Sequence, residues 1–320
     1  MRYLITGGAG FIGSAFVRGL IQGSLKSDFE KIVILDSLTY SGSLENLGKE
    51  VLNDTRVEFV KGDVRESELI TKLVGRSEVI FNFAAESHVD RSILDPEIFL
   101  STNVGGTLNL LNAMRTHSGT RLVQISTDEV YGSILQGSWD ETFPLKPNSP
   151  YSASKASADL MVLAFHATYS LDVVITRCCN NYGPFQYPEK LIPLFIKKLL
   201  NGEKVPIYGD GSQTREWIHV DDHCRGILLA ALKGEAGEIY NLGTSDEIQN
   251  LDLAKILINE LGLEVSQLDF VSDRPGHDQR YSLNTTKSKN DLKFEAQIGF
   301  REGLRDTINW YRRHLSSNSD

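Results

Sequence analysis

The stretch "TGGAGFIG" (residues 6–13) decides the fold, because it joins an apolar run at residues 2–6 to an amphipathic segment at residues 12–22. Gly7, Gly10 and Gly13 are spaced three residues apart. Glycines between a strand and a helix permit a tight turn and let phosphate oxygens approach the N–H groups at the start of the helix. A purely structural turn is the alternative, but the strand–turn–helix context favours a phosphate-binding turn.

The second apolar run, "KIVILD" (residues 31–36), ends in Asp36. A carboxylate at this point can accept hydrogen bonds from a ribose diol and would repel a 2′-phosphate, so the sequence predicts NAD and not NADP as the cofactor. Asp63 ends the third run, "VEFVKGD" (57–63), and two interpretations stay open for it: contact with adenine, or capping.

Short β-branched runs alternate with amphipathic segments through the first half of the chain. The expected strands are 2–6, 31–36, 57–63, 78–84, 121–126 and 172–177, and the expected helices are 12–22, 66–75, 97–117 and 152–170. This alternation predicts an α/β fold with a doubly wound parallel Rossmann sheet.

After residue 178 the regularity ends in segments rich in Gly, Pro and aromatic residues. "HVDDHCRGILLAALK" (219–233) and "EIYNLG" (238–243) are expected to add a helix and a strand to the main sheet, and helices are expected at 251–262 and 301–315. The prediction is therefore an NAD-binding domain of residues 1–177 plus about 217–244. A smaller, discontinuous α/β substrate domain covers about 178–216 and 245–320.

Composition narrows the classes of partner. The 320 residues are 41% hydrophobic and 23% charged, with a formal net charge of −9 and no block of Lys or Arg, so neither nucleic acid nor a membrane is expected as a partner. Neither a signal peptide nor a bilayer-spanning run of ~20 apolar residues is recognisable. The three cysteines, two of them adjacent, do not suggest a disulfide framework and favour a cytoplasmic location.

"YSASK" places Tyr151 and Lys155 four residues apart, on one face of an expected helix. A cation near a phenol lowers its pKa, and the phenolate can then take a proton from an alcohol as hydride leaves for nicotinamide. Lys155 would also bind the nicotinamide ribose. An ordinary surface Tyr/Lys pair is the alternative.

Together, "TGGAGFIG", Asp36 and "YSASK" resemble the extended short-chain dehydrogenases/reductases. "AAESHVDRS" (84–92), "STDEVYG" (126–132), "CCNNYGP" (178–184), "PEKLIPLFI" (188–196), "PIYGDG" (206–211) and "DRPGHD" (273–278) narrow the resemblance to the dTDP-glucose 4,6-dehydratases. The resemblance covers essentially the whole chain. It implies a homodimer, paired through the helices at about 97–117 and 152–170, with dTDP-glucose as substrate.

The adjacent acids of "QISTDEVYGS" (124–133) raise a separate question of geometry. Neighbours on a strand point to opposite faces, so Asp128 and Glu129 reach one ligand only if the strand ends near Ser126 and a turn brings both inward. A capping box from Ser126 to Glu129 is the alternative, but it gives Asp128 no role. Two nearby carboxyls do not readily ionise together, so one can act as an acid and the other as a base.

The resulting hypothesis is a dehydration in three steps. Tyr151 takes the O4 proton while the C4 hydride passes to NAD, and Thr127 hydrogen-bonds O4. The C4 ketone acidifies C5–H, so Glu129 removes that proton while Asp128 protonates the departing O6. Hydride then returns to C6, which yields the 4-keto-6-deoxy sugar.

The resemblance also implies a wider set of binding residues. The expected NAD contacts are Gly7, Gly10, Phe11, Ile12, Gly13, Asp36, Ser37, Thr39, Asp63, Val64, Phe83, Ala84, Ala85, Ser87, Thr102, Tyr151, Lys155 and Asn181. The expected substrate contacts are Ser87, Thr127, Asn180, Lys190, Leu191, Pro206, Tyr208, Arg215, Asn250, Arg274, His277 and Tyr281. An acidic protein that binds a diphosphate needs fixed arginines, which fits Arg215 and Arg274.

Two other functions are compatible with parts of this pattern. A nucleotide-sugar 4-epimerase would need Tyr151, Lys155 and NAD but no acid–base pair, and a non-catalytic NAD-binding regulator would need none of the reactive residues. His219 and His223 stand four residues apart, but no third metal ligand with suitable spacing accompanies them, so no metal site is predicted. Cys178 and Cys179 are interpreted as packing residues.

Overall fold

The structure, a computed structural model, describes residues 1–273 and 276–316. A seven-stranded sheet with the strand order β10-β6-β5-β4-β1-β2-β3 forms its centre, and all of its strand pairs are parallel. The strands are β1 (Arg2–Thr6), β2 (Lys31–Asp36), β3 (Val57–Lys61), β4 (Val79–Asn82), β5 (Arg121–Thr127), β6 (Asp172–Cys178) and β10 (Ile239–Leu242). This confirms the predicted doubly wound α/β fold.

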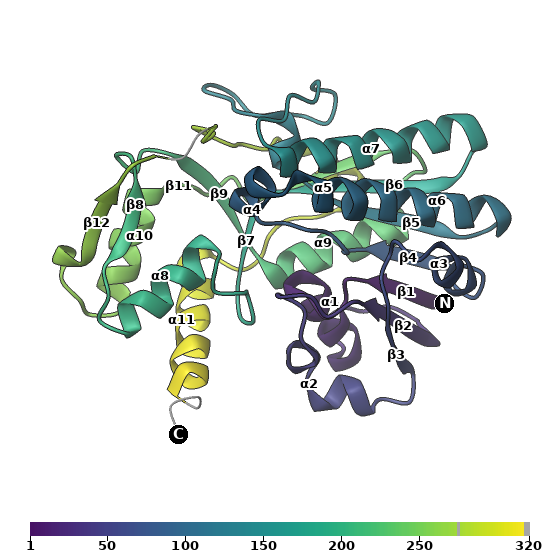
Figure 1. Ribbon diagram of the computed structural model, residues 1–320, viewed down its shortest axis with the longest axis horizontal. Helices are drawn as coiled ribbons and strands as arrows, with labels where there is room; N and C mark the ends of the chain where they lie inside the picture. The colour runs from purple at the N-terminus through teal and green to yellow at the C-terminus, as the bar shows by residue number, and fades with distance from the viewer. Residues whose placement is uncertain (274–275, 317–320) are drawn as a thin grey trace.

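Helices cover both faces of this sheet (Figure 1). One face packs against α1 (Phe11–Gln22), α2 (Leu44–Asn53) and α9 (Val220–Lys233), and the other packs against α3 (Ser67–Val74), α6 (Gly106–Thr116) and α7 (Pro150–Tyr169). Two separate apolar clusters fill these interfaces, which explains why the strands are apolar on both faces. The order of the strands reverses between β1 and β4, and ligands of doubly wound sheets bind at such a switch point.

The single helix expected at 97–117 is in fact interrupted. α4 (Val89–Leu94) and α5 (Pro96–Phe99) precede a π-helical segment, Leu100–Gly105, which leads directly into α6. Within residues 1–273 and 276–316, none of the helices combines the length and apolarity needed to cross a membrane.

A smaller lobe lies beside the carboxyl ends of the strands (Figure 1). It contains a three-stranded sheet of β11 (Glu247–Gln249), β9 (Thr214–His219) and β7 (Asn180–Tyr182), and a two-stranded sheet of β12 (Leu268–Val271) and β8 (Val205–Tyr208). Helices α8 (Leu191–Leu200), α10 (Asn250–Glu260) and α11 (Phe300–Ser316) pack around a third apolar cluster. Two 3-10 helices, Asp128–Tyr131 and Val265–Gln267, and a π-helical turn at Ser288–Leu292 complete the described elements.

Between the two segments of this lobe, α9 and β10 return to the main sheet, as the sequence predicted. β9 pairs with the small sheet as far as His219, two residues beyond the expected boundary at 217. The division of the chain into two domains stays a prediction, and this topology is the observation that supports it.

Candidate active site

The glycine turn lies where a side chain would not fit. Gly7 has a φ of +67°, and a Cβ on it would stand 2.6 Å from the backbone nitrogen of Ala84 on the neighbouring strand connection. A Cβ on Gly13 would lie 2.3 Å from the carbonyl oxygen of Gly7. Gly10 is the N-cap of α1 and supplies no side chain to the free N–H groups of the first turn. The turn therefore leaves exposed backbone donors at the start of a helix, as phosphate binding requires.

Asp36 follows directly at the end of β2. Its two carboxylate oxygens accept hydrogen bonds of 2.8 Å from the backbone N–H groups of Ala9 and Leu38. Burial raises the pKa of the Asp36 carboxyl above its ordinary value, while these backbone donors oppose the shift. The side chain is thus fixed in one orientation at the rim of a cavity of about 140 Å³.

Asp63 shares this cavity, but it does not cap α3, whose N-cap is Glu66. Its carboxylate instead holds Arg65 at 2.7 Å and accepts the Arg65 backbone N–H at 2.9 Å. The capping interpretation is therefore wrong for the helix, because the carboxylate closes a local turn two residues long. Contact with adenine stays a prediction.

The other residues predicted for the cofactor gather around the same space. Each lines either this cavity or a second one of about 260 Å³, and the two cavities share several walls, including Gly7, Gly10, Phe83 and Ala85. The members are Phe11, Ile12, Gly13, Ser37, Thr39, Val64, Ala84, Ser87, Thr102, Tyr151, Lys155 and Asn181.

The paired acids enter the larger of these cavities from a turn. β5 ends at Thr127, and the 3-10 helix Asp128–Tyr131 follows, with Thr127 as its N-cap. The Thr127 hydroxyl accepts the Glu129 backbone N–H at 3.2 Å and donates to Asp128 Oδ1 at 3.2 Å. Asp128 and Glu129 both line the cavity, so the turn does what the sequence argument required of it. The capping box from Ser126 is wrong, because its hydroxyl donates to Asp159 instead.

Asp128 is set apart from its neighbour by burial. It is 1% exposed, and its Oδ2 has no hydrogen-bond partner among the described residues. Burial, followed by the negative charge of Glu129, raises the pKa of the Asp128 carboxyl well above its ordinary value. Desolvation therefore favours the protonated form of Asp128, whereas Glu129 is only half-buried.

Tyr151 and Lys155 lie on the first two turns of α7 and line the same cavity as the acids. The Lys155 ammonium is not directed at the phenol: its Nζ donates to the carbonyl oxygen of Ile125 at 2.6 Å. Burial and the charge of Glu129 raise the pKa of the Tyr151 phenol well above 10. The expectation of a lowered phenol pKa is therefore wrong for the protein alone, because burial and the charge of Glu129 act in the opposite direction.

A third cavity, of about 530 Å³, opens from the acids toward the smaller lobe. It shares Glu129, Asn180, Lys190, Leu191 and Trp217 with the cavity of about 260 Å³. The remaining predicted substrate residues among those described also line it: Pro206, Tyr208, Arg215, Asn250, His277 and Tyr281. Arg274 lies outside the described residues.

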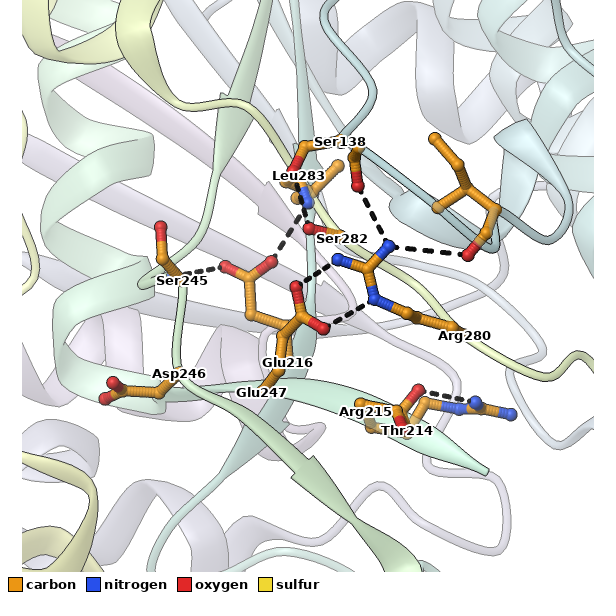
Figure 2. Close-up of polar contacts among 12 residues, drawn as sticks. Ser138, Thr214, Arg215, Glu216, Ser245, Asp246, Glu247, Arg280, Ser282 and Leu283 are labelled. Carbon is orange, nitrogen blue, oxygen red and sulfur yellow. Dashed lines mark hydrogen bonds and ion pairs between the residues drawn. The ribbon is translucent and has the colours of Figure 1, made fainter. Parts of the chain in front are cut away.

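The wall of this cavity is built by β9 and the segment after residue 277. Arg215 donates to the carbonyl oxygen of Asp278 at 2.8 Å and lies over the Tyr281 ring, 4.2 Å from its centroid. The next residue, Glu216, is fully buried and accepts the backbone N–H groups of Thr244, Ser245 and Leu283 at 2.6–3.0 Å. Figure 2 shows Glu216 between these segments while Arg280 turns to Glu247, which it holds with two contacts of 2.6 Å.

Comparison with known proteins places this geometry in a family. The chain matches the family model described as GDP-mannose 4,6 dehydratase over residues 4–307. It is 50% identical to a dTDP-glucose 4,6-dehydratase of Streptomyces niveus over 313 residues, which cover 98% of this chain and 93% of that one. The chain belongs to the nucleotide-sugar 4,6-dehydratase family.

Solved structures agree with this membership. A dTDP-glucose 4,6-dehydratase from Streptomyces venezuelae, crystallised with NAD, has a TM-score of 0.97 and 52% identity, covering 99% of this chain and 98% of that one. A UDP-glucose 4-epimerase from Thermotoga maritima has a TM-score of 0.90 at 31% identity, covering 98% of this chain and all of the other. The epimerase shares the fold, while the higher identity lies with the 4,6-dehydratases.

The 4,6-dehydratase site also contains residues that the sequence argument did not select. Trp217 lines both larger cavities, is 3% exposed, and has no partner for its Nε1 among the described residues. Its signal was the alternation in "TREWIH", which puts Arg215 and Trp217 on one face of a strand and Glu216 on the other. Gln186 and Tyr187 also line the cavity that contains the acids, but their loop gives no periodic signal.

His219 and His223 have separate structural roles. His219 is the N-cap of α9 and accepts the backbone N–H of Asp221. His223 Nδ1 lies 2.8 Å from Asn181 Oδ1, and burial lowers the pKa of His223 to about 3. Cys178 and Cys179 are buried free thiols whose pKa values burial raises, which agrees with packing and not with nucleophilic chemistry.

Proposed function

We propose that this chain is an NAD-dependent dTDP-glucose 4,6-dehydratase that converts its substrate to dTDP-4-keto-6-deoxyglucose. The observation that carries the proposal is the convergence of Asp128 and Glu129 on the cavity that Tyr151 and Lys155 line. A 4-epimerase needs the second pair but has no use for an acid and a base that remove water. The curated 4,6-dehydratases at about half identity support the same assignment.

The residues around the two smaller cavities fit NAD. The glycine turn leaves backbone donors for the diphosphate, Asp36 is fixed where the ribose diol of the adenosine would lie, and Tyr151 and Lys155 stand at the other end. NAD, when bound, supplies a reversible hydride acceptor, and it is regenerated in each turnover. The NAD-containing structure of the Streptomyces venezuelae relative supports this choice of cofactor.

Tyr151 is held as a neutral phenol by the protein alone, because its pKa is raised. Positive charge added to the cavity would favour the phenolate, which is the form that takes the O4 proton of the sugar. The Thr127 hydroxyl, already bonded to the acid turn, is placed to orient O4. Oxidation at C4 produces the ketone that makes C5–H acidic.

The elimination step uses the difference between the two carboxyls. Glu129, half-buried, removes the C5 proton as a carboxylate. Asp128, buried and protonated, gives its proton to O6 as the C6–O6 bond breaks, so one water leaves and a C5=C6 double bond forms. The hydride taken from C4 returns to C6, C5 regains a proton to replace the one that Glu129 removed, and the proton taken from O4 balances the one that Asp128 gave, so the sum is the loss of one water.

The nucleotide is proposed to occupy the 530 Å³ cavity, with Arg215 beside the diphosphate and Tyr208 beside the base. We also propose a homodimer in the cytoplasm. Support for the dimer comes from exposed Leu94, Leu100 and Leu160, which are 85%, 60% and 56% exposed on α4, the π-helical segment and α7. Support for the compartment comes from three buried thiols that form no disulfide.

Incubation of the purified chain with NAD and dTDP-glucose in heavy water tests the proposal. The expected product is the 4-keto-6-deoxy nucleotide carrying one deuterium at C5, identified by mass spectrometry and NMR. Glu129→Gln should abolish both turnover and deuterium uptake, and Glu264→Gln, at an exposed position, serves as its control. A C4 epimer as product, or normal turnover by Glu129→Gln, would contradict the assignment.

A further inference from the structure

A buried polar network lies directly beneath the candidate active site. Arg177 and Asp159, 1% and 0% exposed, form an ion pair of 2.9 Å between β6 and α7. The same guanidinium donates through Nη1 to the Tyr131 hydroxyl at 2.9 Å, and that hydroxyl donates to Asn241 Oδ1 on β10 at 3.0 Å. Asp159 also accepts the Ser126 hydroxyl at 3.0 Å. No step of the proposed reaction uses any of these groups.

The network connects the residues of the oxidation step with the residues of the elimination step. Asp159 stands one helical turn beyond Lys155 and two turns beyond Tyr151 on α7, so it is attached to the residues of the oxidation step. Tyr131 is the last residue of the 3-10 turn that carries Asp128 and Glu129, the residues of the elimination step. Arg177 contacts both partners, and therefore links the rigid helix to the free end of the turn.

Tyr131 is the main anchor of that end. Its ring stacks on Trp139, with centroids 5.3 Å apart and an interplanar angle of 21°, and the Arg177 guanidinium lies 4.8 Å from the Tyr131 ring centroid. Burial raises the pKa of Tyr131 to about 12, so its hydroxyl stays protonated and can donate to Asn241. Beyond it, Gly132 has a φ of +88°, and a Cβ there would lie 2.3 Å from the carbonyl oxygen of Lys146. Stacking and hydrogen bonds together leave the turn one orientation.

We propose that Tyr131 is a positioning residue for the elimination step, and that its hydroxyl, held by Arg177 and Asn241, keeps Asp128 and Glu129 in register with the C4-oxidised sugar. The inference rests on the proposed function. Removal of this hydroxyl takes two hydrogen bonds from the end of the turn but leaves the Arg177–Asp159 pair and the α7 residues in place. Oxidation and elimination should therefore respond differently to its loss.

Tyr131→Phe is the test, because it removes one oxygen and keeps the ring stacked on Trp139. In stopped-flow mixing of the NAD-loaded enzyme with dTDP-glucose, the initial rise in near-ultraviolet absorbance of reduced nicotinamide should keep its rate. Steady-state turnover should fall roughly 10- to 100-fold, the range expected when a catalytic group is slightly misplaced. Reduced cofactor and the 4-keto, 6-hydroxy sugar should then accumulate in acid-quenched samples.

Tyr3→Phe is the matched control, since Tyr3 is similarly buried, lies near the amino end of β1, and has its hydroxyl in contact with Ser27 and the Met1 sulfur, neither of which lines the site. It should show neither effect. Arg177→Lys retains the charge beside Asp159 but cannot hold both partners, and should reproduce the Tyr131→Phe signature. Unchanged turnover by Tyr131→Phe, or a fall in turnover without accumulation of reduced cofactor, would overturn the inference. Failure of the unmodified chain to form the 4-keto-6-deoxy product would instead remove the proposed function, and the inference with it.

Discussion

The cofactor end and the substrate end of the site are built by different means. Around the glycine turn the close contacts are to backbone atoms, both within the turn and of Ala84 on the neighbouring strand connection, and Gly7, Gly10 and Gly13 act through the side chains they lack. At the other end, Arg215 is held by Asp278, 63 residues away, and Glu216 by Leu283, 67 residues away. A short motif can therefore specify the first end, whereas the second exists only after the chain has folded.

The largest expected effect on turnover comes from replacing Asp128. Asp128→Asn keeps the neutral shape of the buried side chain but cannot deliver a proton to O6, so turnover should fall roughly 10²- to 10⁴-fold, the usual contribution of a general acid. Because the pKa of Asp128 is raised, the unmodified enzyme keeps its acid well above the pH at which a solvated Asp ionises. Its turnover should decline as pH rises through that raised pKa, and pH–rate profiles of both proteins would show whether this limb disappears in the variant.

Gly13→Ala tests whether the cofactor end depends on the absence of side chains in the glycine turn. The added methyl would meet the Gly7 carbonyl at 2.3 Å and force the turn open, so NAD affinity should fall about 100-fold, equivalent to about 2.7 kcal/mol. Calorimetric titration with NAD measures this effect. Gly299→Ala, where nothing lies within 4 Å of the added carbon, should bind NAD normally. Equal affinity in the two variants would show that the turn does not hold the diphosphate.

Arg215→Lys tests whether the substrate end depends on the side-chain contacts of Arg215. A lysine keeps the charge but loses the planar fork that spans Asp278 and Tyr281, so we expect KM for dTDP-glucose to rise about tenfold, equivalent to about 1.4 kcal/mol, with a smaller change in kcat. Affinity for NAD should not change. An equal loss of NAD binding would mean that the two ends are not separate.

The last prediction concerns stability and not catalysis. His223→Gln removes the contact between His223 and Asn181, and its effect is on how the free energy of unfolding changes with pH. The folded pKa is about 3 and the unfolded value 6.5, so below pH 6.5 only the unfolded state gains a proton. Stability should therefore fall as pH drops from 6.5 toward 3, by at most about 1.4 kcal/mol per pH unit. Urea unfolding at pH 7, 6 and 5 measures the free energy of unfolding at each pH. This free energy should fall less steeply with falling pH in His223→Gln than in His314→Gln, which changes an exposed histidine.

Sequence reasoning reached the fold because its evidence is local. The alternation of strands with helices and the glycine turn are read from neighbouring residues, even though the contacts they lead to, such as Gly7 with Ala84, span more of the chain. The same reasoning brought Asp128 and Glu129 into one cavity, since strand geometry demands a turn after Ser126. It failed for Lys155, whose ammonium is bound by Ile125, thirty residues upstream in the chain. It also missed Glu216, whose partners come from loops that no periodicity relates to β9, and Trp217, which lies where two cavities built from distant segments meet.

The position of β10 has a consequence for biosynthesis. This edge strand pairs only with β6 in the main sheet, yet it is made after the whole first segment of the smaller lobe. Its Asn241 fastens Tyr131, more than a hundred residues earlier. A nascent chain emerging from the ribosome thus cannot complete its cofactor-binding half first, and the acid turn receives its last support only after Asn241 has been translated.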